Sequence, residues 1–292
     1  MPATLPIIDS HAHFWDVERL DYAWLRAFPA IDRTFLPSDV DRGRHRLDGF
    51  VFVQADCADH QAMAEVDWVA GLASSVPVKA IVAHAPLERD TGVGQHLAAL
   101  ARHPLVTGVR RLIQGEPPGF ATDASFVERV RSLATHDLTF DICVTHEQLT
   151  EAEQLVARCP DVLFILDHLG KPDVAGRRLD PWRAQITALA ARPNVMAKLS
   201  GLATEADPEH WTSSDVAPFL RHALSEFGPA RCLFGGDWPV ATLATTYERW
   251  VDTVLAATSD LSDAERDQVF AGTARRVYRI DSGAGLTPGA PA

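Results

Sequence analysis

Two histidines end an apolar run near the start of the chain, at a spacing that suits shared chemistry. The run IIDSHAHFWD covers residues 7–16 and contains His11, Ala12 and His13. Side chains two residues apart on a strand point to the same face, so His11 and His13 aim at one point in space. Such a pair is either half of a metal site or a hydrogen-bonded pair without metal.

Other groups suited to metal binding follow later apolar runs. Asp167 and His168 come directly after VLFIL, and Asp237 comes directly after RCLFGG. Imidazole and carboxylate groups suit Zn²⁺ or another divalent ion. Taken alone, each histidine could be a hydrogen-bonded structural residue, and Asp237 could cap the next helix. The candidate metal ligands are His11, His13, His168 and Asp237.

Cationic, amide and aromatic side chains near these positions are candidates for binding a polar substrate. The forked guanidinium groups of Arg110 and Arg111 suit a carboxylate or the oxygens of a polyol. A tryptophan beside a site can form an apolar wall or stack on a sugar. The predicted substrate contacts are Arg110, Arg111, Gln54, Trp15, Trp238 and Lys171. We expect His84 and His146 to be structural residues.

Eight short apolar runs alternate with longer amphipathic segments. The runs lie at residues 5–13, 48–56, 77–87, 105–113, 138–146, 162–170, 194–202 and 231–240. They are rich in Val, Ile, Leu and Phe, as strands buried on both faces are. The pattern predicts an α/β fold, a distorted (β/α)8 TIM barrel in a single domain. In such barrels the chemistry occurs at the C-terminal ends of the strands, where these polar residues fall.

The predicted barrel extends over residues 1–280. The first crossover is long and rich in aromatic residues, so we expect a loop insertion at about 14–47 over the barrel mouth. Residues 281–292 are rich in Gly, Pro and Ala and are expected to form a disordered tail. An open doubly wound sheet is the rival architecture. It would usually carry a glycine-rich loop after the first strand, where this chain has HAHFWD.

Composition limits the classes of partner. The chain has 292 residues and is 47% hydrophobic, which is ample for a core, and its net charge of −12 repels a polyanion such as nucleic acid. No apolar run is long enough to span a membrane, and no signal peptide is apparent. The four cysteines lack CxxC spacing, as expected for reduced thiols. We therefore expect a cytoplasmic protein with no nucleic-acid or membrane partner. Barrels of this size are often homodimers.

Seven stretches carry a family resemblance. In chain order they are IDSHAHFWD, GVRRLIQGEPPGF, LTFDICV, FILDHLGKP, KLSGLATEAD, FGPARCLFGGDWPV and YERW. With them the chain resembles the amidohydrolase superfamily, in the amidohydrolase-related branch that contains sugar-acid lactonases. The resemblance extends over nearly the whole chain, from residue 7 to residue 280.

The resemblance implies a role for each matching residue. His11 and His13 fall on the family's first-strand histidine pair, and His168 falls on its sixth-strand histidine. Asp237 falls on the eighth-strand aspartate, which usually acts as general acid and base. Many members carry a bridging lysine or glutamate on the fourth strand, where this chain has arginines. One divalent metal ion, with zinc favoured, or no metal at all therefore fits better than a two-metal site.

The activity that the resemblance implies is hydrolysis of a lactone. The substrate would be an aldono-lactone such as L-fucono-, L-rhamnono- or L-galactono-lactone, opened by metal-assisted or aspartate-assisted attack of water. Asp237 would move the proton, and His168 would bind the metal or polarise the carbonyl. The alternatives are a hydrolase of a dicarboxylate lactone or pyrone, and a metal-dependent decarboxylase. A catalytically silent barrel is disfavoured because all four candidate ligands are present.

Overall fold

All eight predicted strands form, and they lie parallel and in chain order around one barrel. The structure, a computed structural model, describes residues 5–89 and 91–280, so the predicted tail at 281–292 lies outside the described residues. Each strand overlaps the apolar run that predicted it. The strands are β1 (Ile7–Ala12), β2 (Leu47–Val53), β3 (Val78–His84), β4 (Val106–Arg110), β5 (Thr139–Ile142), β6 (Phe164–Leu166), β7 (Val195–Leu199) and β8 (Cys232–Phe234).

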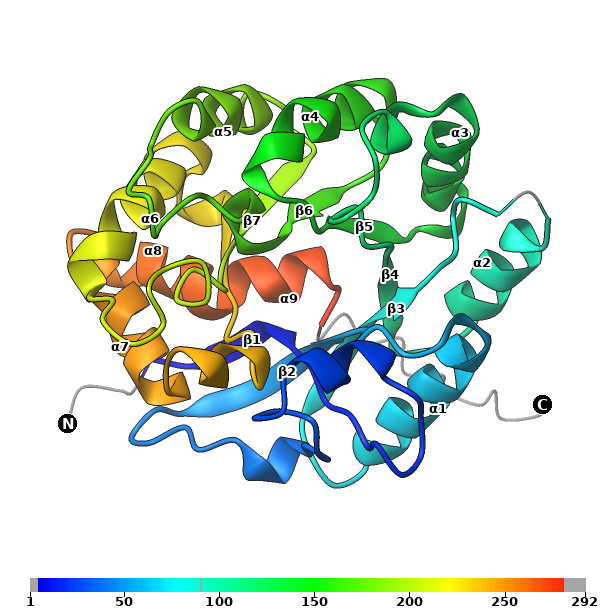
Figure 1. Ribbon diagram of the computed structural model, residues 1–292, viewed down its shortest axis with the longest axis horizontal. Coiled ribbons are helices and arrows are strands. Elements are labelled where there is room, and N and C mark those ends of the chain that lie inside the picture. Colours follow the sequence, from blue (N-terminus) through cyan, green and yellow to red (C-terminus); the bar gives the residue numbers. More distant parts are fainter. Residues whose placement is uncertain (1–4, 90, 281–292) are drawn as a thin grey trace, which may run out of the picture.

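Helices surround the strands and also cover one end of the barrel. The helices are α1 (Ala62–Leu72), α2 (Val93–Ala101), α3 (Ala124–Ser132), α4 (Leu149–Arg158), α5 (Trp182–Ala190), α6 (Ser213–Phe227), α7 (Tyr247–Ala257), α8 (Asp263–Asp267) and α9 (Thr273–Val277). Most form an outer ring, whereas α9 crosses the centre of the view in Figure 1. The prediction of a (β/α)8 barrel is thus confirmed. In the described part of the chain, no helix is both long and apolar enough to cross a membrane.

The ring is closed less regularly between β1 and β8 than elsewhere. A single parallel bridge joins Ala12 to Trp238. Around it, the Asp237 amide donates to the His11 carbonyl at 2.7 Å. The buried carboxylate of Asp9 adds a further link, because it accepts from the amides of His11 and Gly236 at 2.9 and 2.8 Å. The predicted distortion therefore lies at this seam, where the candidate ligands from β1 and β8 meet.

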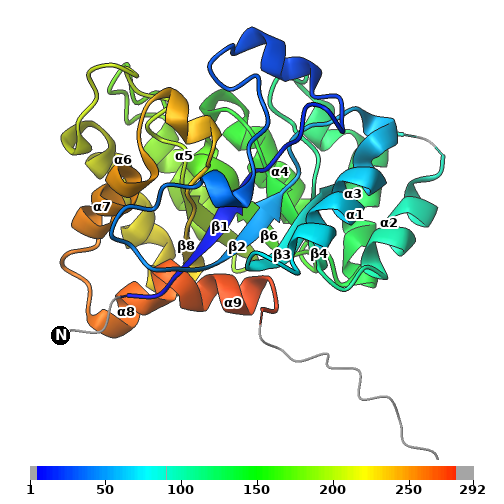
Figure 2. The same cartoon turned by 90° about the horizontal axis from the view of Figure 1, so that it is seen from below.

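An apolar cluster fills the lower part of the barrel interior. It joins inward-facing strand residues such as Ile8, Val51 and Ile165 to Val277 and Tyr278 at the end of α9. Figure 2 shows α9 beneath the strands and the N-terminal insertion at the opposite side. Because α9 covers the lower end, a small molecule has to enter the barrel from the other end.

The insertion between β1 and β2 lies over that upper end (Figure 2). Its aromatic residues pack on one another: the Trp15 ring lies 5.5 Å from Trp24 and 5.6 Å from Phe35, edge to face. The Trp24 indole donates to the carbonyl of Ala55, just after β2, at 2.8 Å. These contacts anchor the insertion on the barrel.

A buried carboxylate beneath the insertion makes the stability of this region depend on pH. Glu65 of α1 is fully buried and accepts from the Ala55 amide at 3.1 Å. Burial raises the pKa of Glu65 to about 7. An unfolded glutamate titrates near ~4.3, so between about pH 4.3 and 7 the folded state binds more protons than the unfolded state. The contribution of Glu65 to stability is therefore lost as the pH rises through this window.

The substitution Glu65→Gln removes this titration. Between pH 5 and pH 8, its free energy of unfolding should rise relative to that of the wild type by about 2 kcal/mol. Urea unfolding at the two pH values measures the change. An equal difference between the two proteins at both pH values would contradict the prediction.

Candidate active site

Three imidazoles and one carboxylate meet at the upper end of the barrel. His11 lies on β1, His13 directly follows it, and His168 and Asp237 follow β6 and β8. The Asp237 Oδ1 atom lies 3.7, 3.5 and 3.9 Å from the Nε2 atoms of His11, His13 and His168. The Nε2 atoms of His11 and His13 are 3.1 Å apart. We refer to these four residues as the histidine–aspartate cluster.

The backbone at the strand ends is shaped to present these side chains. His168 and Asp237 both have φ of 53°, in the left-handed region that is rare for residues with a side chain. Gly201 leaves space beside His168, because a Cβ atom at Gly201 would lie 2.3 Å from the His168 Nδ1 atom. Such conformations persist only where the surroundings impose them, and they concentrate at functional sites.

Hydrogen bonds behind the rings fix their orientation. The Nδ1 atom of His13 lies 2.7 Å from the Val53 carbonyl, which can only accept, so this nitrogen carries the ring proton. The Nδ1 atom of His168 lies 2.9 Å from the Ser200 hydroxyl. In both residues Nε2 is thus turned toward Asp237. Supporting contacts of this kind accompany metal-binding histidines.

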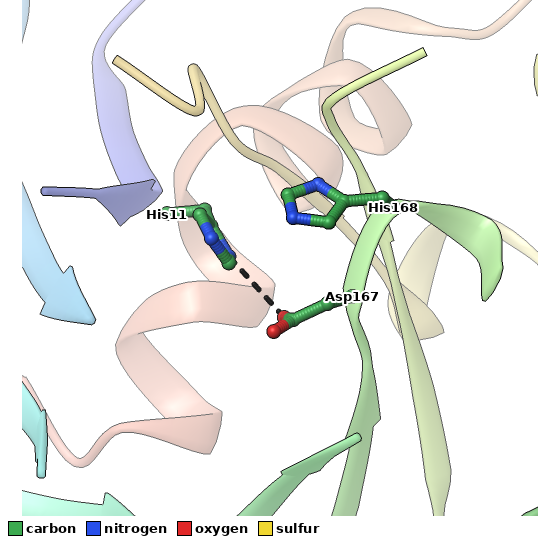
Figure 3. Close-up of side chains that lie close together, drawn as sticks. All are labelled: His11, Asp167 and His168. Atoms are coloured by element: carbon green, nitrogen blue, oxygen red, sulfur yellow. Dashed lines mark ion pairs between the residues drawn. The ribbon is translucent and has the colours of Figure 1, made fainter. Parts of the chain in front are cut away.

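A layer of buried charges lies next to the cluster. Lys198 of β7 forms ion pairs with Asp141 of β5 and with Asp167, the latter at 2.9 Å. Arg110 at the end of β4 lies 3.3 Å from Asp167, whose other carboxylate oxygen is 3.2 Å from the His11 Nδ1 atom. Figure 3 shows His11, Asp167 and His168 together. Asp141 and Lys198 are visible in the sequence as charges inside apolar runs, but their partners are not.

Burial and neighbouring charges set the ionisation of the cluster. Burial lowers the pKa of His168 to about 4, so its imidazole is neutral. Burial by itself would raise the pKa of Asp237, but its interactions with the neighbouring imidazoles, that of His168 first, bring this pKa below its usual range. The cluster therefore offers an ionised carboxylate beside the neutral imidazoles of His11 and His168.

This donor set fits one divalent ion. Zinc ligands about 2.0–2.2 Å from a tetrahedral centre lie roughly 3.5 Å from one another. The ligand atoms of His11, His13 and Asp237 lie 3.1–3.7 Å from one another, and His168 Nε2 adds a further donor 3.9 Å from Asp237 Oδ1. Asp167 also lies close to His11 and His168, but it already faces Lys198 and Arg110. The chemistry of the histidine–aspartate cluster therefore fits a divalent ion.

A cavity of about 300 Å³ opens onto the cluster. This volume is at the small end of the range of roughly 300–1,000 Å³ in which small molecules bind. Arg110 and Lys171 contribute positive charge to it, and Trp24 and Phe28 contribute aromatic surface. The other lining residues are His13, Ala55, Asp56, Leu112, Gln114, Cys143, His168, Thr204, Asp237 and Val240.

Two predicted polar contacts lie outside this cavity. Arg111 is directed away from it and pairs with Glu88 at 2.7 Å and Glu116 at 2.5 Å. The side chain of Gln54 is fully buried and accepts from the Asp56 amide at 2.6 Å. Arg111 therefore supports the surface around the cavity, and Gln54 shapes the turn after β2.

The two predicted tryptophan contacts also lie outside the cavity. Trp15 is fully buried, and its indole donates to the Arg33 carbonyl at 2.7 Å. Trp238 packs edge to face on Phe35 at 5.4 Å. Both are part of the packing under the insertion, whereas Trp24, which the sequence did not single out, reaches the cavity. Only the aromatic richness of the insertion pointed to such a residue.

His84 and His146 do not line the cavity either. The His146 Nδ1 atom lies 3.0 Å from the carbonyl of Lys171, a contact that helps to fix the backbone there. His84 is buried 3.5 Å from Asp59. The structural roles expected for both residues stay a prediction.

Comparison with known proteins places the chain in context. A family model described as Amidohydrolase matches residues 8–280. The chain is 35% identical to an L-fucono-1,5-lactonase of Burkholderia multivorans, over 94% of this chain and 96% of the relative. It is 26% identical to an L-rhamnono-gamma-lactonase of Scheffersomyces stipitis, over 70% of this chain and 69% of the relative.

A solved structure of an amidohydrolase from Burkholderia multivorans with bound zinc superposes with a TM-score of 0.84. It is 32% identical to this chain, and the match covers 94% of this chain and 99% of the other. The similarity thus extends over the complete barrel.

Proposed function

This chain belongs to the amidohydrolase family, and from that premise we propose that it hydrolyses the ring ester of a sugar lactone. The observation that carries the proposal is the histidine–aspartate cluster at the base of a cavity that also holds Arg110 and Lys171. The two lactonase relatives support the substrate class.

Opening a lactone requires a proton acceptor beside the attacking water and a proton donor for the leaving oxygen. Asp237 lines the cavity and can serve both steps. Its carboxylate takes one proton from the water as the water oxygen bonds to the carbonyl carbon. The ring C–O bond then breaks, and Asp237 returns that proton to the leaving alkoxide. The product is a hydroxy acid.

The cationic residues of the cavity suit the charge that develops on the substrate. Negative charge forms first on the carbonyl oxygen and remains on the product carboxylate. Arg110 is nearly fully buried, so its interaction with such a charge is only weakly screened by water. Lys171 lies at the rim, 3.8 Å from Glu205, where it can reach a hydroxyl or carboxylate oxygen.

The histidine–aspartate cluster would hold the metal ion through His11, His13, His168 and Asp237. When bound, a divalent ion would polarise the lactone carbonyl and lower the pKa of water. The zinc in the solved structure of the Burkholderia multivorans relative supports zinc as the ion. The aromatic surface of Trp24 and Phe28 suits the apolar face of a sugar ring.

A lactone panel with and without metal tests the proposal. We expect acid release, followed with a pH indicator, from at least one of L-fucono-, L-rhamnono- and L-galactono-lactone. Dialysis against a chelator should lower that rate at least about tenfold, and Zn²⁺ should restore it. An unchanged rate would assign His11 and His13 as a hydrogen-bonded pair without metal.

The same panel should include dicarboxylate lactones, pyrones and aromatic acids. Arg110 and Lys171 could also bind a substrate with two carboxylates. Activity restricted to the dicarboxylates, or release of carbon dioxide from an aromatic acid, would replace the proposed substrate class.

A further inference from the structure

The Nδ1 atom of His11 has two neighbours of opposite kind. One can only donate a proton to it, and the other can only accept a proton from it. The His11 Nδ1 atom lies 3.1 Å from the Lys198 ammonium and 3.2 Å from Asp167 Oδ1 (Figure 3 shows the contact with Asp167). A neutral imidazole carries one proton, so Nδ1 either accepts from Lys198 or donates to Asp167. The choice also decides whether the outer nitrogen, Nε2, carries the proton.

The geometry favours acceptance from Lys198. The contact between Lys198 and His11 has the arrangement of a hydrogen bond. The 3.2 Å contact between His11 Nδ1 and Asp167 Oδ1 does not have hydrogen-bond geometry, and that oxygen lies closer to the Lys198 ammonium, at 2.9 Å. Lys198 is fully buried and paired with Asp141 and Asp167, so it is an ammonium with three protons to donate.

The contacts on the other side of His11 agree with this assignment. His13 carries its proton on Nδ1, which faces the Val53 carbonyl, so His13 Nε2 has a free electron pair. His11 Nε2 is 3.1 Å away and must therefore donate to it. Each hydrogen-bond donor in this chain then has an acceptor: Lys198 donates to His11, His11 donates to His13, and His13 donates to the Val53 carbonyl.

We propose that Lys198 is a positioning residue that keeps the His11 proton on Nε2 and thereby lowers the affinity of the histidine–aspartate cluster for a divalent cation. This inference rests on the proposed metal-binding role of the cluster. A cation requires the electron pair of Nε2, so the proton has to move to Nδ1, facing Asp167. Lys198 then loses its hydrogen bond to His11, and no proton is released.

The tautomer of His11 in metal-free protein is the direct test. Long-range ¹H–¹⁵N spectra of ¹⁵N-histidine-labelled protein report which ring nitrogen carries the proton, and the His11→Gln variant assigns the signal. We expect protonated Nε2 and unprotonated Nδ1 in the wild type. The opposite assignment would overturn the proposal, and this measurement needs no variant of Lys198.

Two variants isolate the effect of Lys198. Asp141→Asn retains Lys198 and should keep the proton on Nε2. Lys198→Met in the Asp141→Asn background removes the ammonium without leaving Asp141 as an unpaired buried charge. In this double variant the proton should move to Nδ1. The double variant should then bind Zn²⁺ at least about tenfold more tightly than Asp141→Asn does, because the tautomer that can bind the ion is no longer a minor species.

Zinc affinity is measured by competition with a chromophoric chelator. Equal affinities and equal tautomers in the two variants would assign Lys198 a purely structural role and overturn the inference. Tighter binding with an unchanged tautomer would attribute the effect to charge alone and would also overturn it. Both readouts are independent of substrate, so they remain decisive even if the lactone panel shows no turnover.

Discussion

The substitution Asp237→Asn is expected to lower kcat for lactone hydrolysis by about 10²–10⁴-fold, the range typical of losing a positioned general base. The carboxylate lies 3.5–3.9 Å from three imidazoles and borders the cavity. An amide has nearly the same shape but cannot take the proton of the attacking water. Asparagine also tolerates the left-handed backbone at this position, so the fold should be retained.

Asp56 provides a matched control for this experiment. It is a second aspartate lining the cavity, and its φ of 59° is also left-handed. It has no place in the histidine–aspartate cluster, so Asp56→Asn should change kcat by less than about threefold, as expected without loss of acid–base catalysis. Initial rates at saturating lactone measure both variants, and circular dichroism checks the fold. Equal losses would mean that general negative charge, rather than proton transfer at Asp237, supports turnover.

The barrel could be predicted because its signal is local in the sequence. Each parallel strand is buried on both faces, so it appears as a short run of Val, Ile, Leu and Phe. The contact between His11 and His13 was likewise predictable, since residues two apart on a strand share a face. Their Nε2 atoms are indeed 3.1 Å apart. Strand order then brings His168 and Asp237 to the same end of the barrel.

The lining of the cavity could not be predicted in the same way, because it depends on tertiary contacts. Trp15 and Trp24 are both aromatic residues of the insertion, yet only Trp24 reaches the cavity. Which of them does so depends on how the insertion folds back on β2, through the bond from Trp24 to Ala55. Composition shows that the loop is aromatic but not which ring faces the substrate.

The buried charges illustrate a second limit. Lys198 lies in an otherwise apolar strand, and the sequence alone does not reveal what balances its charge. In the barrel its neighbours are Asp141 from β5 and Asp167 after β6, both distant in the chain. A fully buried charge requires partners of opposite charge close to it. A charged residue inside an apolar run therefore signals a buried network, but the members of the network appear only in three dimensions.

Arg110 and Arg111 are adjacent in the chain, and we expect substitutions at the two positions to have very different effects on catalysis. Arg110 lines the cavity, donates to the Gln54 carbonyl at 2.6 Å and lies 3.3 Å from Asp167. Lysine retains the charge but not the planar fork, so Arg110→Lys loses part of these contacts. We expect kcat/KM to fall about 100-fold, which corresponds to roughly 3 kcal/mol of lost interaction with a charged group.

Arg111→Lys is the matched control, with the same chemical change one residue further along the chain. Arg111 pairs with Glu88 and Glu116 outside the cavity. Loss of a partly exposed pair costs at most about 1 kcal/mol of stability, and kcat/KM should stay within about twofold of the wild type. Initial rates over a range of lactone concentrations separate KM from kcat for both variants. A larger loss for Arg111→Lys than for Arg110→Lys would show that the guanidinium used in catalysis is the one that this structure directs away from the cavity.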